Sequence, residues 1–497
     1  MGETVNISDL MVQSGVKFGT SGARGLAHDM TDRVCYAYTT AFIQYLEETG
    51  ELKKSGGAIA VGGDLRSSTE RIMTAAVRAI SDKGYEPQCC GILPAPALAN
   101  YGLINEIPTV MVTGSHIPED RNGIKYTKRE GEILKYDEAG IKLEAVTLPH
   151  GLFDGAGTFL VEEKPLIPGS DASDLYLNRY LDFFPHDCLS GKKVGVYQHS
   201  AAGRDQMVEI LSGLGAHVTP LGYSDIFIPV DTEAIRPEDV EAAKIWSDEH
   251  HFDAIISTDG DGDRPLISDE HGKWLRGDVA GILCAAFLEA DAVATPISCN
   301  SAVEKCGFFK AVHRTKIGSP FVIEAMQQAQ EEGAERVVGY EANGGFLTAS
   351  PFESGGKILS PLPTRDAMIL HIAILLLSIE KNLTISKLVS ELPQRFSFSN
   401  RLKEFPAEKS IAKINELYSG DESRDKVTIG NILGGQFGPV DSFDTTDGLR
   451  ITFESDEIVH LRPSGNAPEF RCYNEAATES RAIEMNQICM DIMANWR

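Results

Sequence analysis

Residues 252–264 read FDAIISTDGDGDR. The first seven residues are mostly apolar and predict a buried β-strand, and aspartates alternate with glycines directly after it. Asp259, Asp261 and Asp263 would repel one another in so short a loop without a cation between them. Their hard carboxylate oxygens suit Mg²⁺, and the glycines let the backbone bend so that the side chains converge. The stretch therefore predicts a strand of an α/β sheet that ends in a magnesium site.

Two other kinds of site share features with this acidic loop. An EF-hand needs glycine at the sixth position of its loop, where this chain has Arg264, and helices instead of strands on both sides. An EF-hand is therefore excluded. A phosphatase with an aspartyl nucleophile also carries two carboxylates after an apolar strand, and Asp259 or Asp261 would then attack phosphorus. The motif alone leaves this second alternative open.

Short apolar strands alternate with helical patterns through most of the chain. We expect strands at 58–61, 108–113, 192–198 and 335–341, and helices at 68–83 and 206–214. Such alternation is typical of parallel α/β layers. After about residue 395 the pattern changes to strands at 447–455, 457–464 and 469–476 and a closing helix from residue 480. The C-terminal part is therefore expected to be a smaller α+β domain.

A length of 497 residues predicts three or four domains, since a domain usually has about 100–200 residues. Candidate boundaries lie near residues 165, 276 and 396, and the first is close to a segment rich in Pro and Gly. The expected division is 1–165, 166–275, 276–395 and 396–497. The fold class predicted for the first three ranges is a three-layer α/β/α unit.

The charge and composition of the chain limit the kinds of molecule that it is expected to bind. Lys and Arg number 46 against 72 Asp and Glu, so the net charge of −26 argues against a nucleic-acid partner. It does not argue against a small anion, because a few cations in a cleft can set a local positive field. The nine cysteines show no metal spacing and are expected to be reduced. No leader pattern and no apolar run long enough for a membrane is visible, so a cytoplasmic location without a membrane partner is expected.

A second motif, TGSHIPEDRNGIK, follows the strand at 108–113 and spans residues 113–125. Catalytic side chains in α/β sheets often lie where a strand ends. Ser115 stands beside a glycine in a tight turn, His116 can exchange protons, and Lys125 can return to the same pocket. The spacing differs from that of a GxSxG hydrolase elbow. An ordinary polar loop is the alternative for this segment taken alone.

Three further segments carry polar groups suited to a phosphate or a sugar. In LRPSGNAPEFR at 461–471, the turn offers backbone N–H groups, a hydroxyl and a guanidinium, which together suit phosphate. In GYEANGG at 339–345, a carboxylate and an amide can hold sugar hydroxyls. KFGTSGARG at 17–25 is a Gly-rich loop without the P-loop pattern. Each segment is also compatible with an ordinary turn.

Together, the order and spacing of these segments from residue 17 to 471 resemble the α-D-phosphohexomutase family, which includes phosphomannomutases and phosphoglucomutases. The resemblance implies four domains around a central cleft. It implies an isomerase that interconverts hexose 1-phosphate and 6-phosphate through a phosphoserine and a hexose 1,6-bisphosphate, with that bisphosphate as activator. It also implies one Mg²⁺ per chain and a monomer or weak homodimer. The sequence is most similar to bacterial phosphomannomutases, so mannose is the expected sugar.

The resemblance assigns roles to individual residues. Ser115 would be the phosphoserine and would complete the magnesium site with Asp259, Asp261 and Asp263. The other catalytic positions would be Arg24, His116, Lys125 and Arg264, with His116 or Lys125 as the base. The substrate-binding positions would be Lys316 and Gly318 in TKIGS, the sugar-selecting Glu341 and Asn343, and the phosphate clamp of Arg462, Ser464, Gly465, Asn466 and Arg471.

Two departures from the family pattern affect these assignments. The clamp reads SGNAP where relatives commonly carry SGTEP, so Ala467 stands in place of a carboxylate. The sugar loop reads EANGG where many relatives carry E-x-S-G-H, so Gly345 stands in place of a histidine. The sugar preference is therefore open, with phosphoglucomutase and phosphoglucosamine mutase as alternatives. The aspartyl phosphatase and a non-catalytic sugar-phosphate sensor are alternatives of other classes.

Overall fold

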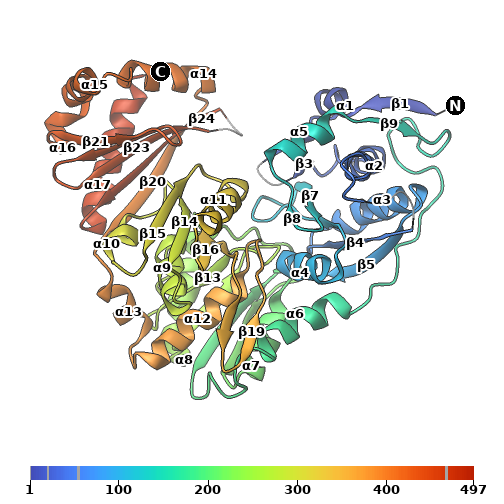
Figure 1. Cartoon of the computed structure of the whole chain (residues 1–497), viewed down its shortest axis with the longest axis horizontal. Helices are drawn as coiled ribbons and strands as arrows, with labels where there is room; N and C mark the ends of the chain where they lie inside the picture. Colours follow the sequence, from blue (N-terminus) through green and yellow to red (C-terminus); the bar gives the residue numbers. More distant parts are fainter. Residues whose placement is uncertain (1, 20–21, 53–55, 465–467, 497) are drawn as a thin grey trace. The chain divides into compact units, whose positions relative to one another are not determined.

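The computed structural model describes residues 2–19, 22–52, 56–464 and 468–496, and Figure 1 labels its helices and strands. The chain divides into two compact units, one of residues 1–290 with 335–388 and one of residues 291–334 with 389–497. Each unit thus combines two stretches that are separate in the sequence. The four consecutive domains expected from the sequence remain a prediction.

The N-terminal sheet of the first unit has seven strands, in the order β2-β3-β7-β6-β4-β5 with β8 paired to β7. β4, β5 and β6 are parallel, whereas β7 runs antiparallel to β6 and to β3. The expected parallel layer is therefore mixed, because a loop instead of a crossover helix joins β6 to β7. The strands are β2 (Lys17–Phe18), β3 (Ala23–Leu26), β4 (Ala58–Gly63), β5 (Glu86–Ile92), β6 (Thr109–Val112), β7 (Arg121–Lys128) and β8 (Gly131–Glu132).

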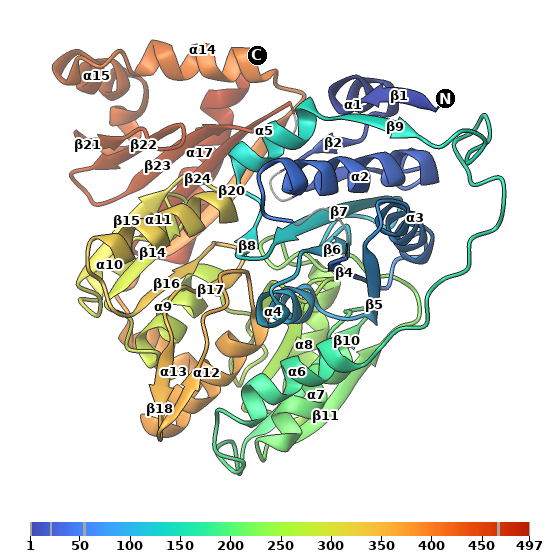
Figure 2. The same cartoon turned by 45° about the vertical axis from the view of Figure 1, so that its right-hand side comes forward.

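Helices lie on both faces of this sheet, with α2 and α3 on one side and α4 on the other (Figure 2). The helix expected at 68–83 is confirmed as α3, and its apolar positions Ile72, Ala76 and Ile80 are fully buried. Thr31 begins α2 by accepting a hydrogen bond from the Val34 N–H. The helices are α1 (Ile7–Ser14), α2 (Asp32–Glu48), α3 (Thr69–Asp82), α4 (Ala95–Asn105) and α5 (Lys135–Leu143), and β1 (Glu3–Asn6) pairs with β9 (Ala145–Leu148).

The second sheet of this unit contains the strand that precedes the acidic loop, within residues 252–264. Its order is β11-β10-β12-β13, in which β10 is parallel to β11 and β12, and β13 is antiparallel to β12. All residues of β12 are buried, as the apolar run predicts. The elements are β10 (Lys193–His199), β11 (His217–Tyr223), β12 (Ala254–Thr258), β13 (Pro265–Ile267), α6 (Asp171–Leu181), α7 (Arg204–Gly213) and α8 (Pro237–His250).

The remaining elements of the first unit are two antiparallel strand pairs and two apolar helices. These are β16 (Val337–Tyr340) with β17 (Phe346–Thr348), β18 (Phe352–Ser354) with β19 (Lys357–Leu359), α9 (Gly277–Phe287) and α12 (Ala367–Glu380). Within the described residues, no single helix is long and apolar enough to cross a membrane. Only α12 together with α13 (Ile385–Glu391), bent by 85°, has the necessary length and composition, and α12 is buried along most of its length.

The second unit contains the α+β fold that the C-terminal sequence predicts. Its five-stranded antiparallel sheet has the order β20-β24-β23-β22-β21, and α17 packs against β20 and β24. β14 and β15, which pair in parallel and lie outside this five-stranded sheet, belong to the same unit. The elements are β14 (Ala292–Pro296), α10 (Ala302–Lys305), β15 (Ala311–Thr315), α11 (Ser319–Glu331), β20 (Phe396–Lys403), α14 (Ala407–Leu417), α15 (Glu422–Ile429), η1 (Gly430–Gly434), α16 (Gly435–Phe437), β21 (Val440–Asp444), β22 (Leu449–Phe453), β23 (Ile458–Pro463), β24 (Glu469–Ala476) and α17 (Glu479–Ala494).

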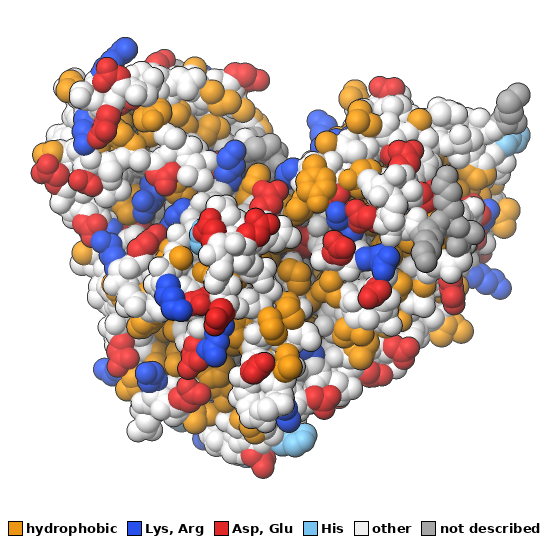
Figure 3. Space-filling model, in the orientation of Figure 1, with side chains coloured by type: hydrophobic (Ala, Val, Ile, Leu, Met, Phe, Trp, Pro, Cys, Tyr) orange, Lys and Arg blue, Asp and Glu red, His pale blue; other side chains and the backbone are white. Residues whose placement is uncertain are grey.

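Acidic and basic side chains are interspersed on the face of the molecule drawn in Figure 3. The excess of acidic residues is therefore not confined to one patch on that face.

A buried carboxylate connects α6 to the start of α12 within the first unit. Asp366 is 2% exposed and accepts hydrogen bonds from the Tyr176 hydroxyl at 2.7 Å, from the Tyr180 hydroxyl and from the Met368 N–H. Because a buried carboxylate depends on every hydrogen-bond donor that it has, these tyrosines stabilise the contact between the two helices.

We expect Tyr176→Phe to lower the free energy of unfolding by about 1.5–3 kcal/mol, because it removes one donor from a buried carboxylate. Urea unfolding followed by circular dichroism measures the change. Tyr101→Phe is the matched control, since the Tyr101 hydroxyl donates to the neutral amide oxygen of Gln88 at 2.9 Å. An equal loss in both variants would contradict a special role for Asp366.

Candidate active site

Ser115 lies in the loop that follows β6, with its side chain fully buried. Its backbone φ is 56°, a left-handed conformation that is uncommon for a residue with a Cβ atom. The Ser115 N–H donates to the Thr113 hydroxyl at 2.8 Å. The Ser115 hydroxyl donates to Asp259 Oδ2 at 2.6 Å. The serine loop and the acidic loop, far apart in the sequence, therefore meet at this hydroxyl.

The acidic loop is a tight turn between β12 and β13. Asp259, Asp261 and Asp263 are buried, and one oxygen of each lies within 4.8 Å of the others. The glycines between them are required by close contacts. A Cβ at Gly260 would lie 2.8 Å from the Ser115 carbonyl oxygen, and Gly262 has a φ of 72°.

The donor set of this loop fits a divalent cation. Asp261 Oδ1 and Asp263 Oδ1 are buried and accept no hydrogen bond from the described residues. Buried carboxylate oxygens without a donor are unfavourable unless a cation binds them. Carboxylate oxygens grouped in one loop are also the ligands that Mg²⁺ prefers. These aspartates could therefore hold a magnesium ion.

The pKa values of the carboxyl groups at the two ends of the acidic loop shift in opposite directions. Burial, reinforced by the charges of Asp261 and Asp263, raises the pKa of Asp259 well above its ordinary value. Burial would also raise the pKa of Asp263, but Lys125, Arg365 and Arg264 outweigh it and hold that pKa below its ordinary value.

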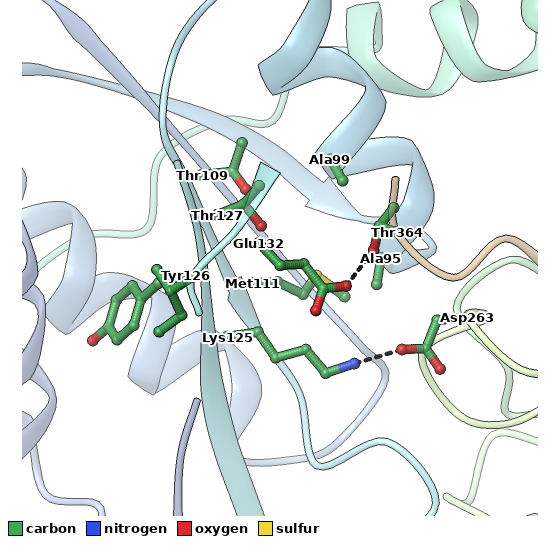
Figure 4. A pocket seen from close by; sticks show the side chains of 11 residues that line it. Ala95, Ala99, Thr109, Met111, Lys125, Tyr126, Thr127, Glu132, Asp263 and Thr364 are labelled. Atoms are coloured by element: carbon green, nitrogen blue, oxygen red, sulfur yellow. Dashed lines mark hydrogen bonds and ion pairs between the residues drawn. The ribbon is translucent and has the colours of Figure 1, made fainter. Parts of the chain in front are cut away.

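Lys125 on β7 extends toward the acidic loop (Figure 4). Its Nζ lies 2.6 Å from Asp261 Oδ2 and 2.7 Å from Asp263 Oδ2. Burial would lower the pKa of Lys125, but these two carboxylates outweigh it and raise the pKa. Lys125 is therefore a proton donor in this arrangement and offsets part of the loop's negative charge.

Arg264 connects the acidic loop to His116. Its Nη1 donates to His116 Nδ1 at 2.8 Å, and its Nε lies 3.9 Å from Asp259 and 3.6 Å from Asp263. A histidine nitrogen that accepts from arginine belongs to a neutral ring. Burial, followed by the charge of Arg264, lowers the pKa of His116 to about 3. Arg24 on β3 belongs to the same electrostatic group, since burial and then Arg264 lower its pKa to about 10.

The sugar-loop residues predicted from GYEANGG lie after β16. Glu341 is 3% exposed, and its Oε2 accepts from Arg365 Nε at 2.5 Å. Asn343 Oδ1 accepts from the Gly345 N–H at 2.9 Å, and its carbonyl accepts from the Thr232 hydroxyl at 2.6 Å. The Glu341 carboxylate is thus paired with an arginine that the sequence motifs do not include.

Arg365 explains one departure from the family pattern. It lies just before α12, is 3% exposed, and also reaches Asp263 Oδ2 with Nη1 at 3.4 Å. A Cβ at Gly345 would lie 2.4 Å from Arg365 Cδ, so a histidine at that position would clash with this arginine. The feature of the sequence that could have pointed to Arg365 is the polar pair of Arg365 and Asp366 directly before an apolar helix.

The other predicted substrate-binding residues lie in the second unit. Lys316 and Gly318 follow β15, Arg462 and Ser464 lie at the end of β23, and Arg471 lies on β24 opposite Arg462. One carboxylate connects the two groups, because Asp447 Oδ2 accepts from Arg462 Nε at 2.7 Å and from the Ile317 N–H at 3.0 Å. Gly465 and Asn466 lie outside the described residues.

The predicted residues therefore form two groups. The described structure of the first unit brings together the serine loop, the acidic loop, their basic partners and Glu341. The second unit brings the TKIGS loop and the clamp residue Arg462 to one aspartate, Asp447.

Comparison with known proteins agrees with this geometry. The family model described as phosphoglucomutase/phosphomannomutase, alpha/beta/alpha domain I matches residues 15–146, and the model for domain III of the same family matches residues 276–396. A phosphomannomutase of Salmonella muenchen is 42% identical over 97% of this chain and 96% of its own length. A phosphomannomutase of Sinorhizobium fredii is 43% identical over 93% of this chain and 95% of its own.

Solved structures show the same fold at lower identity. A phosphoglucomutase/phosphomannomutase family protein from Burkholderia thailandensis has a TM-score of 0.71 and 17% identity, with 96% of each chain covered. The Aspergillus fumigatus N-acetylphosphoglucosamine mutase, solved with GlcNAc-6P and magnesium, has a TM-score of 0.59 and 13% identity, with 99% of each chain covered. Identity above 40% over nearly the whole length, together with the two family models, shows that this chain belongs to the phosphoglucomutase/phosphomannomutase family of isomerases.

Proposed function

We propose that this enzyme is a phosphomannomutase, which interconverts mannose 1-phosphate and mannose 6-phosphate. Two named phosphomannomutases are 42% and 43% identical to it over most of their length, whereas the phosphoglucosamine mutases compared are 26–29% identical. The observation that carries the chemistry is the 2.6 Å hydrogen bond from the Ser115 hydroxyl to Asp259, inside a cluster of three buried aspartates.

Ser115 would carry the phosphoryl group. Phosphoserine 115 transfers its phosphoryl group to the free hydroxyl of the hexose phosphate, and the P–O bond to the serine breaks as the new one forms. The resulting hexose 1,6-bisphosphate turns around, and its other phosphate returns to Ser115. Such a transfer depends mainly on in-line positioning and on neutralisation of the spreading negative charge. A variant of the Aspergillus fumigatus N-acetylphosphoglucosamine mutase has been solved in complex with glucose 1,6-bisphosphate, which supports a bisphosphate activator.

The charged side chains around Ser115 suit this transfer. Asp259, Asp261 and Asp263 would hold Mg²⁺, which supplies Lewis-acid stabilisation of a phosphoryl oxygen when bound. Arg24 and Arg264 would lie beside the transferring group and offset its charge. Of the two candidate bases, His116, whose pKa is lowered, would accept the proton of the attacking hydroxyl in preference to Lys125, whose pKa is raised by Asp261 and Asp263.

The remaining roles concern the sugar and the distal phosphate. Glu341 and Asn343 would select the sugar. Lys316, Gly318, Arg462, Ser464, Gly465, Asn466 and Arg471 would hold the phosphate that is not being transferred. The Nε of Arg462 is bonded to Asp447, and guanidinium groups bind phosphate well.

Ser115→Ala should abolish the labelling of the protein by radioactive hexose 1,6-bisphosphate and lower kcat by at least about a thousandfold, because it removes the nucleophile. Phosphopeptide mapping of the wild type should place the label on Ser115. Ser480→Ala, at an exposed position, is the control and should leave both readouts unchanged. Label on an aspartate would instead support the aspartyl phosphatase.

Asp261→Asn should weaken Mg²⁺ binding by at least about 100-fold, because even the loss of a residue that only supports a metal ligand costs about 10–100-fold. Isothermal titration of the protein with MgCl₂ measures the affinity independently of activity, and kcat should fall with it. Asp491→Asn on α17 is the charge-matched control. Unchanged Mg²⁺ affinity in Asp261→Asn would remove the metal assignment.

The enzyme should show different kcat/KM values for mannose 1-phosphate, glucose 1-phosphate and glucosamine 6-phosphate, each assayed with its bisphosphate activator. We expect mannose 1-phosphate to have the highest value, because this chain is 42% and 43% identical to two phosphomannomutases. A higher kcat/KM for either other sugar phosphate would contradict the mannose assignment and leave the mutase chemistry intact.

A further inference from the structure

Arg66, in the loop between β4 and α3, contacts almost the whole serine loop. Its side chain has no exposed surface. A guanidinium has five N–H donors, and all five are used here. Nη2 donates to the carbonyls of Ser115 (2.8 Å) and Ile117 (2.6 Å), Nη1 to those of Pro118 (2.7 Å) and Arg121 (3.1 Å), and Nε to Asp64 Oδ2 (3.1 Å).

Asp64, the partner of Arg66, contacts the two residues that precede Ser115. Its Oδ2 accepts from the Thr113 hydroxyl at 2.7 Å and from the Gly114 N–H at 3.3 Å. The Thr113 hydroxyl in turn accepts from the Ser115 N–H. The pair of Arg66 and Asp64 therefore holds backbone or side-chain groups on both sides of Ser115.

The position of this pair follows from the sheet. β4 and β6 are parallel neighbours, with Gly63 opposite Val112, so the loops that follow them emerge side by side. The contact is close, because a Cβ at Gly114 would lie 2.6 Å from Arg66 Cζ. The ring of Phe227 covers the guanidinium, with 3.9 Å from its centroid to Arg66 Cζ.

Ser115 needs such a support. Its left-handed backbone is disfavoured for a residue with a Cβ and persists only where the surroundings determine it. The orientation of its hydroxyl toward Asp259 depends on that backbone. A buried ion pair is in itself weak evidence for a gain in stability, so the pair of Arg66 and Asp64 is better explained by what it positions.

We propose that Arg66 is a positioning residue for phosphoryl transfer: its guanidinium holds the loop from Thr113 to Arg121 so that Ser115 stays directed at the acidic loop. This rests on the proposed role of Ser115 as phosphoryl carrier. Arg66 would not touch the substrate, so its loss should reduce the rate of transfer and leave substrate affinity nearly unchanged.

Arg66→Lys tests this proposal, because lysine keeps the charge but has three donors on one nitrogen and cannot reach four carbonyls at once. We expect kcat to fall by about 100-fold, which is the typical effect of a misplacement of about 1 Å, while KM for the sugar phosphate changes little. The rate at which hexose 1,6-bisphosphate labels Ser115 should fall by the same factor.

Arg71→Lys is the matched control. Arg71 also donates to two backbone carbonyls, those of Met30 and Ala27, and pairs with Asp32, but it does not contact the serine loop. We expect this variant to keep kcat, KM and the labelling rate within about twofold, since it leaves the reacting groups in place. Equal losses of kcat in Arg66→Lys and Arg71→Lys would show a general effect on folding and overturn the proposal.

A second pair of variants tests the same support without changing a charge. Thr113→Val removes the hydroxyl that joins Asp64 to the Ser115 N–H, and Thr113→Ser keeps it. We expect the labelling rate to fall at least about tenfold in Thr113→Val and to be restored in Thr113→Ser, because only the hydroxyl bond differs in its effect on Ser115. If Arg66→Lys does not fold, the labelling rates of Thr113→Val and Thr113→Ser test the proposal by themselves.

The possible outcomes distinguish the positioning role of Arg66 from the proposed function of the enzyme. Wild-type labelling rates in both Arg66→Lys and Thr113→Val, with the wild-type protein labelled on Ser115, would overturn the positioning role alone. A wild-type protein that is not labelled on Ser115 would overturn the proposed function itself.

Discussion

The burial of three carboxylates in one short loop is the constraint on which the rest of the first unit depends. Asp259, Asp261 and Asp263 are at most 3% exposed. Charges removed from water in this way are strongly unfavourable unless cations or metal ions offset them. The fold brings cations to the loop from three separate segments of the chain. They are Lys125 on β7, Arg264 directly before β13 and Arg365 just before α12. Segments far apart in the chain are thereby drawn to one point.

Ser115 depends on the same loop. Its hydroxyl donates to Asp259, and the glycine at 260 lets the acidic turn approach the serine backbone. The pair of Arg66 and Asp64 in turn holds the carbonyls and the hydroxyl around the serine. The nucleophile proposed for phosphoryl transfer is thus fixed between two sets of charged groups. Preorganisation of this kind is what a reaction dominated by positioning and electrostatics requires.

At the sugar loop, the glycine that departs from the family pattern leaves room for a neighbouring side chain. Gly345 leaves the space that Arg365 fills, and Arg365 links Glu341 to Asp263. Glu341 is therefore tied electrostatically to the acidic loop. In the second unit, Asp447 links two predicted ligand-binding segments in a similar way, because it bonds to both Arg462 and the backbone beside Lys316. Both predicted ligand-binding loops are thus held by charged residues outside the recognised motifs.

The sequence alone was sufficient for local features. The apolar run 252–258 predicted β12, the spacing of Ile72, Ala76 and Ile80 predicted α3, and the alternation of aspartate with glycine predicted a cluster of carboxylates. Periodicity and composition report such features because they depend on neighbours in the chain. The antiparallel course of β7 was not predictable in this way, since strand direction depends on pairing across the sheet.

The partners of the motif residues were decided only by the tertiary structure. The polar pair of Arg365 and Asp366 stands out before an apolar helix, but the sequence does not identify the partners of Arg365 or Arg66. Their contacts with Asp263 and Ser115 join positions 102 and 49 residues apart. The pKa of His116 likewise depends on Arg264, a residue 148 positions away that donates to its ring. The sequence by itself determined which chemical groups are present and on which strand ends they lie. The tertiary structure decided which of them neutralise one another, because burial and charge pairing act through space and not along the chain.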